Sequence, residues 1–120
     1  METHTYKLHG SKYHGHFQKI LVTAAFCNAK VEVCHVHPTD PTYCTEAENS
    51  PTRSLPLLET KDGKLSEANA IANYIANNSN PAFLGKSSWE KAQVAQWTDF
   101  AGYDLHKNTH SCVYPLFGKL

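Results

Sequence analysis

Residues 54–76 read SLPLLETKDGKLSEANAIANYIA, a proline-led apolar run followed by a turn signal and a second apolar repeat. The apolar run at residues 55–59 predicts a β-strand. Pro56 belongs at the first residue or at an edge of that strand, because proline has no N–H to donate to a ladder of hydrogen bonds. The segment therefore predicts a strand whose entry is fixed by a proline.

The dipeptide Asp62-Gly63 is a strong signal for a tight hairpin. Residues 64–66 are therefore expected to pair antiparallel with residues 57–59. A helix should follow, because apolar residues then recur at three- and four-residue steps. The repeat consists of Ala68, Ile71, Ala72, Ile75 and Ala76, and it ends at Asn77, Asn78 and Pro81.

The residues before this segment predict a strand, a helix and a second strand. Residues 6–9 and the alternating residues 30–34 are the two strand candidates. The helix between them is indicated by Phe17, Ile20, Leu21, Ala24 and Ala25, with Asn28 as its stop. Residues 37–54 are rich in turn formers and lack any period, so they predict a long loop with room for one irregular helical turn.

The residues after the segment predict one further helix. Ser87 and Glu90 have the spacing of a capping box, in which the two residues exchange hydrogen bonds at a helix start. One face of this helix carries Val94, Trp97 and Ala101. The helix is expected to run to about His106, and the tail beyond it, with Pro115 and Gly118, is expected to be irregular.

The order of these elements indicates the fold class. A strand–helix–strand unit implies a right-handed crossover between parallel strands. The hairpin then adds two antiparallel strands, and the helix after it covers one face of the sheet. The sequence therefore predicts an α/β fold, a thioredoxin-like βαβ-ββα domain.

Composition excludes several classes of function. The 120 residues carry 11 basic and 11 acidic side chains, so no basic patch attracts a phosphate backbone. No apolar run approaches the ~20 residues of a membrane span. Histidines stand in pairs, His14-x-His16 and His35-x-His37, and two imidazoles are too few for a metal site, so no metal is expected. The cysteines form no metal or disulfide pattern, which indicates reduced thiols in the cytoplasm: Cys27, Cys34, Cys44 and Cys112.

The hairpin and the helix after it resemble the signature of the glutathione transferase superfamily. That signature has a cis proline at the strand entry and, after the hairpin, Glu or Gln, Ser, any residue, Ala and Ile. The matching residues here are Pro56 and then Glu67, Ala68, Asn69, Ala70 and Ile71. The resemblance implies a thioredoxin-like domain at residues 1–80. Residues 81–120 would be the start of a truncated helical C-terminal domain, including its first helix.

Within the superfamily, the chain is most similar to the gamma subunit of eukaryotic translation elongation factor 1B. The residues that carry this narrower likeness are 67–74, the run AQWTDFA at 95–101 and the run VYPLFG at 113–118. Similar modules are appended to some aminoacyl-tRNA synthetases. The resemblance implies a docking role in translation, with other elongation factor 1B subunits or aminoacyl-tRNA synthetases as partners.

The resemblance also implies a glutathione site at specific positions. A thiol-activating donor would stand after the first strand, where Ser11 and Tyr13 are the candidates, although a serine in such a turn is commonly only a turn former. Leu55, before a cis Pro56, would pair through its backbone with the cysteinyl part of glutathione. Glu67 remains at the carboxylate site, together with a helix N-terminus that favours an anion.

Ala68 stands at the carboxylate site where the family has a serine hydroxyl. Losing that hydrogen bond would cost about 1.5–3 kcal/mol, or more than tenfold in affinity. Two functions therefore remain open: a non-catalytic or weakly active binding module, with glutathione as a weak ligand at most, and an active glutathione S-transferase.

The last predicted helix carries more aromatic residues than one helix face can bury. We expect them to form an interface, and a symmetric homodimer is the commonest arrangement for such a surface. The predicted interface residues are Trp89, Trp97, Phe100 and Tyr103.

Overall fold

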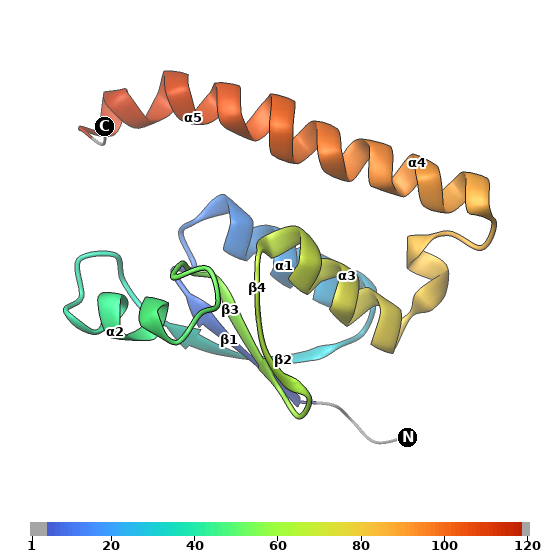
Figure 1. Cartoon of the computed structure of the whole chain (residues 1–120), viewed down its shortest axis with the longest axis horizontal. Helices are drawn as coiled ribbons and strands as arrows, with labels where there is room; N and C mark the ends of the chain where they lie inside the picture. The colour runs from blue at the N-terminus through green and yellow to red at the C-terminus, as the bar shows by residue number, and fades with distance from the viewer. Residues whose placement is uncertain (1–4, 119–120) are drawn as a thin grey trace. The chain divides into compact units, whose positions relative to one another are not determined.

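A mixed sheet of four strands is the framework of the first part of the chain (Figure 1). The computed structural model describes residues 5–118, and the chain divides into two units, the first ending at Phe83 and the second beginning at Leu84. The first unit contains, in chain order, β1 (Thr5–Gly10), α1 (Gly15–Phe26), β2 (Lys30–His35), α2 (Thr42–Glu48), β3 (Leu57–Thr60), β4 (Gly63–Ser66) and α3 (Ala68–Ser79). The short 3-10 helix η1 (Pro81–Leu84) follows α3.

The register of the sheet brings four strand ends together. The strand order is β2-β1-β3-β4, and β1 runs parallel to β2 with Gly10 opposite His35. β3 is antiparallel to both neighbours, with Leu57 opposite His9 of β1 and Ser66 of β4. The carboxyl ends of β1 and β4 therefore lie beside the start of β3, and the carboxyl end of β2 lies beside that of β1. This topology confirms the predicted thioredoxin-like arrangement and the predicted hairpin register.

The core lies between the sheet and the helices α1 and α3, which cover one face of it (Figure 1). Leu58 is fully buried in this core, whereas Leu57 points to the opposite face because side chains alternate along a strand. The apolar repeats predicted for both helices supply most of the core, although Ala25 is exposed. The buried core residues are Tyr6, Leu8, Phe17, Ile20, Ala24, Leu58, Ala68, Ile71 and Ile75.

The expectation of a long loop with one irregular helical turn across residues 37–54 is only partly correct, because the seven-residue helix α2 forms within it. Asp40 starts the helix: its carboxylate accepts hydrogen bonds from the backbone N–H (2.9 Å) and the hydroxyl (2.7 Å) of Thr42. Ala47 is the one buried residue of the helix. A helix of seven residues that buries a single alanine leaves no apolar period in the sequence.

The second unit is a helical rod that starts at the predicted capping box (Figure 1). The Ser87 hydroxyl accepts a hydrogen bond from the Glu90 N–H (3.1 Å), and the Glu90 carboxylate accepts one from the Ser87 N–H (3.2 Å). The rod consists of α4 (Ser88–Asp99), the π-helical η2 (Phe100–His106), α5 (Lys107–Val113) and the 3-10 helix η3 (Tyr114–Phe117). Within residues 5–118, no helix is long and apolar enough to cross a membrane.

The expected irregular tail after His106 is also wrong, because the rod continues through α5 and η3. Pro115 lies in the first turn of η3, where its missing N–H costs nothing, and Gly118 ends the rod with a left-handed φ of 67°. The proline and the glycine thus mark the end of a helix instead of a loop. Helical periodicity was absent here because no described side chain of α5 is buried.

We predict that Gly10→Ala destabilises the first unit and that Gly15→Ala does not. Gly10 has a φ of +149°, and a methyl group there would lie 2.9 Å from the ring of the buried Phe17. The expected loss is roughly 1–3 kcal/mol of unfolding free energy, measured by urea denaturation. Gly15 begins α1 with open space around it, so alanine should be neutral or stabilising by about 0.4–1 kcal/mol. Equal stabilities of the two variants would contradict this account.

Candidate functional site

The candidate site lies where β1 ends, β3 begins and α3 begins. A methyl group on Gly10 would lie 3.5 Å from Cα of Pro56, so the end of β1 closely approaches the entry to β3. The Leu55–Pro56 peptide bond is cis, as predicted. Pro56 immediately precedes β3, and Ser66 at the end of β4 is opposite Leu57. The register therefore places Leu55 and Pro56 close to the turn from β4 into α3.

Glu67 forms that turn with an unusual backbone. Its φ of 71° and ψ of 116° lie in a region that side-chain-bearing residues seldom adopt. The Glu67 side chain makes no capping hydrogen bond to α3, and the first intrahelical bond runs from the Ile71 N–H to the Glu67 carbonyl (2.9 Å). The amides of residues 68–70 at the start of α3 thus form a helix N-terminus of the kind that binds anions. Ala68 is buried there and offers only a methyl group.

The two predicted thiol-site residues lie in different surroundings. Ser11 is buried directly after β1, and its carbonyl accepts a hydrogen bond from the His14 N–H (3.0 Å). Tyr13 is 69% exposed, and its ring makes T-shaped contacts with the rings of His35 and His37, whose centroids are 5.6 Å and 6.3 Å away. Ser11 is therefore a buried residue directly after β1, whereas Tyr13 is an exposed residue beside the last residue of β2, His35.

The comparisons with known proteins agree with this geometry. Residues 5–77 match the family model described as the glutathione S-transferase N-terminal domain. The chain belongs to this family. Its curated relatives include elongation factor 1-gamma of Prunus avium, 33% identical over 92% of this chain, and elongation factor 1-gamma 1 of Oryza sativa subsp. japonica, 34% identical over 83%. The chain covers 27% and 25% of those two relatives, about a quarter of their length.

Solved structures of glutathione transferases share the fold. The theta-class enzyme of Xanthomonas axonopodis pv. citri, solved with glutathione bound, is 21% identical with a TM-score of 0.74 over 82% of this chain and 49% of the enzyme. A mutant of poplar glutathione transferase F1 is 18% identical with a TM-score of 0.78 over 93% of this chain and 55% of the other. A Caenorhabditis elegans glutathione transferase is 27% identical with a TM-score of 0.67, and the aligned parts cover 82% of this chain and 49% of that one.

Several features of this glutathione S-transferase N-terminal domain were not predicted from its sequence. Lys19 of α1 donates a hydrogen bond from Nζ to Oδ1 of Asn69 in the first turn of α3 (2.5 Å). Burial lowers the pKa of the Lys19 ammonium group. This hydrogen bond links α1 to the start of α3. The two residues are 50 positions apart in the sequence, so no local motif could predict their contact.

The cysteines near the core are poor nucleophiles. Burial raises the pKa of the Cys27 thiol, and Cys27 is a small core residue, as predicted. Burial also raises the pKa of Cys34, and the negative charge of Glu32 adds to that effect. The thiolate is the reactive form, so a raised pKa disfavours thiol chemistry at both positions. No group of three or more metal-ligating side chains gathers anywhere in residues 5–118.

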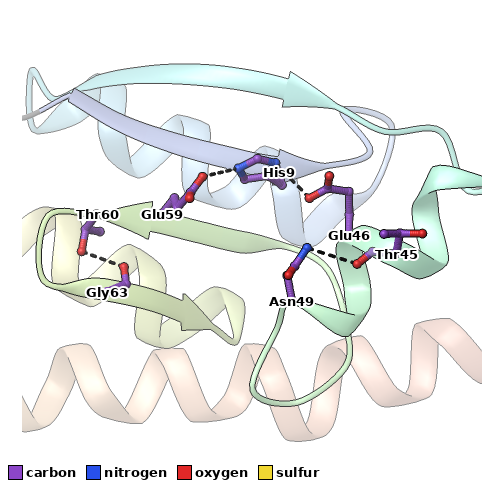
Figure 2. A network of polar contacts seen from close by, with 7 residues as sticks. All are labelled: His9, Thr45, Glu46, Asn49, Glu59, Thr60 and Gly63. Carbon is purple, nitrogen blue, oxygen red and sulfur yellow. Dashed lines mark hydrogen bonds and ion pairs between the residues drawn. The ribbon is translucent and has the colours of Figure 1, made fainter.

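His9 joins three elements on the face of the sheet opposite α1 and α3 (Figure 2). Its Nε2 lies 3.0 Å from Oε2 of Glu59 on β3, and its Nδ1 lies 3.5 Å from Oε2 of Glu46 on α2. The hydrogen bond from His9 holds the pKa of Glu59 below its ordinary value. Lys7 is opposite Glu59 and His9 is opposite Leu57, so Glu59 reaches His9 diagonally across the two strands. No local sequence pattern predicted either of the His9 contacts.

The four aromatic residues predicted as an interface are all exposed on the helical rod. Their exposed fractions range from 45% for Phe100 to 74% for Tyr103. The rings of Trp97 and Phe100 meet edge to face, with centroids 5.8 Å apart. No described side chain between residues 84 and 118 is buried, so the rod has no apolar core of its own.

We predict that Glu67→Gly gives a more stable protein than Glu67→Ala. Both substitutions remove the carboxylate, but only glycine adopts a φ of 71° without strain. The expected difference in unfolding free energy is about 1 kcal/mol in favour of the glycine variant, measured by urea denaturation. Alanine equal to or above glycine would show that the turn before α3 is not strained.

Proposed function

We propose that this chain is a non-catalytic or weakly active glutathione-transferase-like module that docks proteins of the translation elongation machinery. The observation that carries the proposal is Ala68, a buried methyl group at the start of α3 where a transferase would place a hydroxyl. The fold is retained around this position, with the cis Leu55–Pro56 bond and the Glu67 turn both present. An intact scaffold with a weakened ligand site suits a docking module better than an enzyme.

The relatives support the translation part of the proposal. The curated proteins that match this chain at 30–34% identity include elongation factor 1-gamma of plants and of Artemia salina. We propose that the chain acts in the cytoplasm and binds other elongation factor 1B subunits, with aminoacyl-tRNA synthetases as the alternative partners. Mixing the full chain with each purified subunit in turn, followed by size-exclusion chromatography, tests this directly. Separate elution of the chain from every subunit and synthetase would refute it.

Glutathione is proposed as a weak ligand of the same site. The helix N-terminus at residues 68–70 would hold its γ-glutamyl carboxylate beside Glu67, and the backbone of Leu55 would pair with its cysteinyl part. Bound glutathione would supply the nucleophilic thiol, and Ser11 or Tyr13 would have to stabilise the thiolate by donating a hydrogen bond. Ser11 is buried and Tyr13 is exposed, so only one of the two candidates is shielded from water.

An active transferase is the second candidate function, and the nearness of the β1 end to Pro56 favours it. Two assays distinguish the docking module from the active transferase: retention on glutathione-agarose and conjugation of glutathione to a standard electrophile. We expect weak retention and turnover far below that of ordinary transferases. Turnover comparable to theirs would establish the enzyme instead.

We predict that Ala68→Ser strengthens glutathione binding by up to roughly tenfold, because it restores one hydrogen bond to a carboxylate. Isothermal titration with glutathione measures the change. The matched control is Ala72→Ser, which adds the same hydroxyl to a half-buried position of the same helix, beyond the amides of residues 68–70. Equal affinities of the two variants and the unmodified chain would show that the carboxylate is held elsewhere.

We also propose that the chain forms a homodimer through the aromatic surface of the rod. Each aromatic side chain that becomes buried contributes roughly 2–3 kcal/mol. We predict that replacing Trp97 and Phe100 by alanine weakens the dimer at least tenfold in analytical ultracentrifugation. Phe26→Ala, which removes an exposed aromatic of the first unit, is the control and should leave the dimer unchanged. A chain that stays monomeric at tens of micromolar would contradict the proposal.

A further inference from the structure

Two histidines lie one helical turn apart on the second unit. His106 is the last residue of η2, and His110 lies in α5. The backbone at the junction is regularly helical, with φ and ψ of −65° and −46° at His106 and of −58° and −46° at Lys107. Residues four positions apart on such a helix share one face. The two imidazoles therefore belong to the same side of the rod.

The rings of these two histidines are arranged so that both can reach one metal ion. Their centroids are 5.9 Å apart, and their planes are inclined by 62°. The lone pair of an imidazole nitrogen lies in the plane of its ring, so two inclined rings can direct their lone pairs to a common point. The ring of Tyr114, one turn further along, has its centroid 3.7 Å from that of His110 and limits the rotation of the His110 ring. Neither histidine is buried, so an ion can reach both from solvent.

The two histidine pairs of the first unit are less suited to share an ion. The rings of His14 and His16 are stacked, with planes only 26° apart, so their lone pairs do not converge. In the other pair, Nδ1 of His35 accepts a hydrogen bond from a backbone N–H, and Nδ1 of His37 is hydrogen-bonded to a hydroxyl. Among these pairs, the one on the rod has the geometry of a chelate. Two histidines four positions apart on a helix are a known arrangement for binding zinc.

A single chain supplies only half of a zinc site. Zn²⁺ in a structural site takes four ligands in a tetrahedron, and imidazole nitrogen is one of its preferred ligands. Residues 5–118 contain no group of three or more metal-ligating side chains, so no third ligand of the described chain lies beside His106 and His110. A second copy, related by a two-fold axis through the ion, would bring the same two imidazoles and complete the tetrahedron. We propose that Zn²⁺ bridges two copies of this chain through His106 and His110 of each copy.

The rod offers this place to a second copy. No described side chain between residues 84 and 118 is buried, so nothing in the second unit covers the two histidines. The bridge uses none of the four aromatic residues proposed above for the homodimer. It therefore does not depend on that contact, and the two can be tested separately.

Titration of the full chain with Zn²⁺, followed by calorimetry and analytical ultracentrifugation, tests the bridge. We expect one Zn²⁺ to bind per two chains, because each copy supplies two of the four ligands. The weight-average mass should rise about twofold on addition of Zn²⁺ and fall again on addition of EDTA. Zinc that binds without raising the mass would overturn the proposal, and so would a chain that binds no zinc.

The variant in which Trp97 and Phe100 are both replaced by alanine separates this bridge from the aromatic homodimer. It should show the same twofold rise in mass with Zn²⁺, whatever its mass in the absence of the ion. A rise that is lost in this variant would assign the effect of zinc to the aromatic surface and would overturn the bridge.

An exchange of two neighbouring residues provides the matched comparison. His110→Ser combined with Ser111→His keeps the composition and moves the imidazole about 100° around the helix, away from the face of His106. We expect this variant to lose the rise in mass and to bind Zn²⁺ at least roughly tenfold more weakly, because two of the four ligands are displaced. His106→Gln should lose the rise as well. His37→Gln, which removes a histidine of the first unit, is the control and should keep it. An exchanged variant that still doubles its mass with Zn²⁺ would overturn the proposal.

Discussion

The antiparallel pairing of β3 with both of its neighbours is the constraint on which the rest of the first unit depends. Because β3 runs against β1 and β4, its entry lies beside the carboxyl ends of both. That single reversal brings the end of β1, the cis Leu55–Pro56 bond and the turn into α3 to one place. Leu57 and Leu58 anchor the strand by burying one side chain on each face of the sheet.

The sequence was most informative where burial repeats along the chain. The β3–β4 register and both core helices were predicted correctly, because each buries one face and so places apolar residues at regular intervals. The cis Leu55–Pro56 bond was also predicted, but from the family resemblance. The full length of α2 and the whole of α5 were not predicted for the opposite reason: α2 buries a single alanine, and α5 buries no described side chain.

Part of the candidate site was equally beyond the reach of sequence patterns. Glu67 and Ala68 were located by a motif, but the Lys19–Asn69 and His9–Glu59 contacts join residues 50 positions apart. Such pairs form because secondary-structure elements pack together, and no local sequence spacing predicts them. The His9–Glu46 contact was not predicted for two reasons. Its residues are far apart in the sequence, and Glu46 lies on α2, whose full length was not predicted.

The π-helical turns at Phe100–His106 divide the rod into two parts that differ in angular phase. A π-helix winds more residues into each turn than an α-helix, so every residue after it is rotated away from the line that the preceding turns would continue. The side chains of α4 therefore follow one angular phase of the rod, and the side chains of α5 follow another. A partner surface that follows one row of side chains on α4 would lose that row beyond Phe100, which limits how far such a contact can extend along the rod.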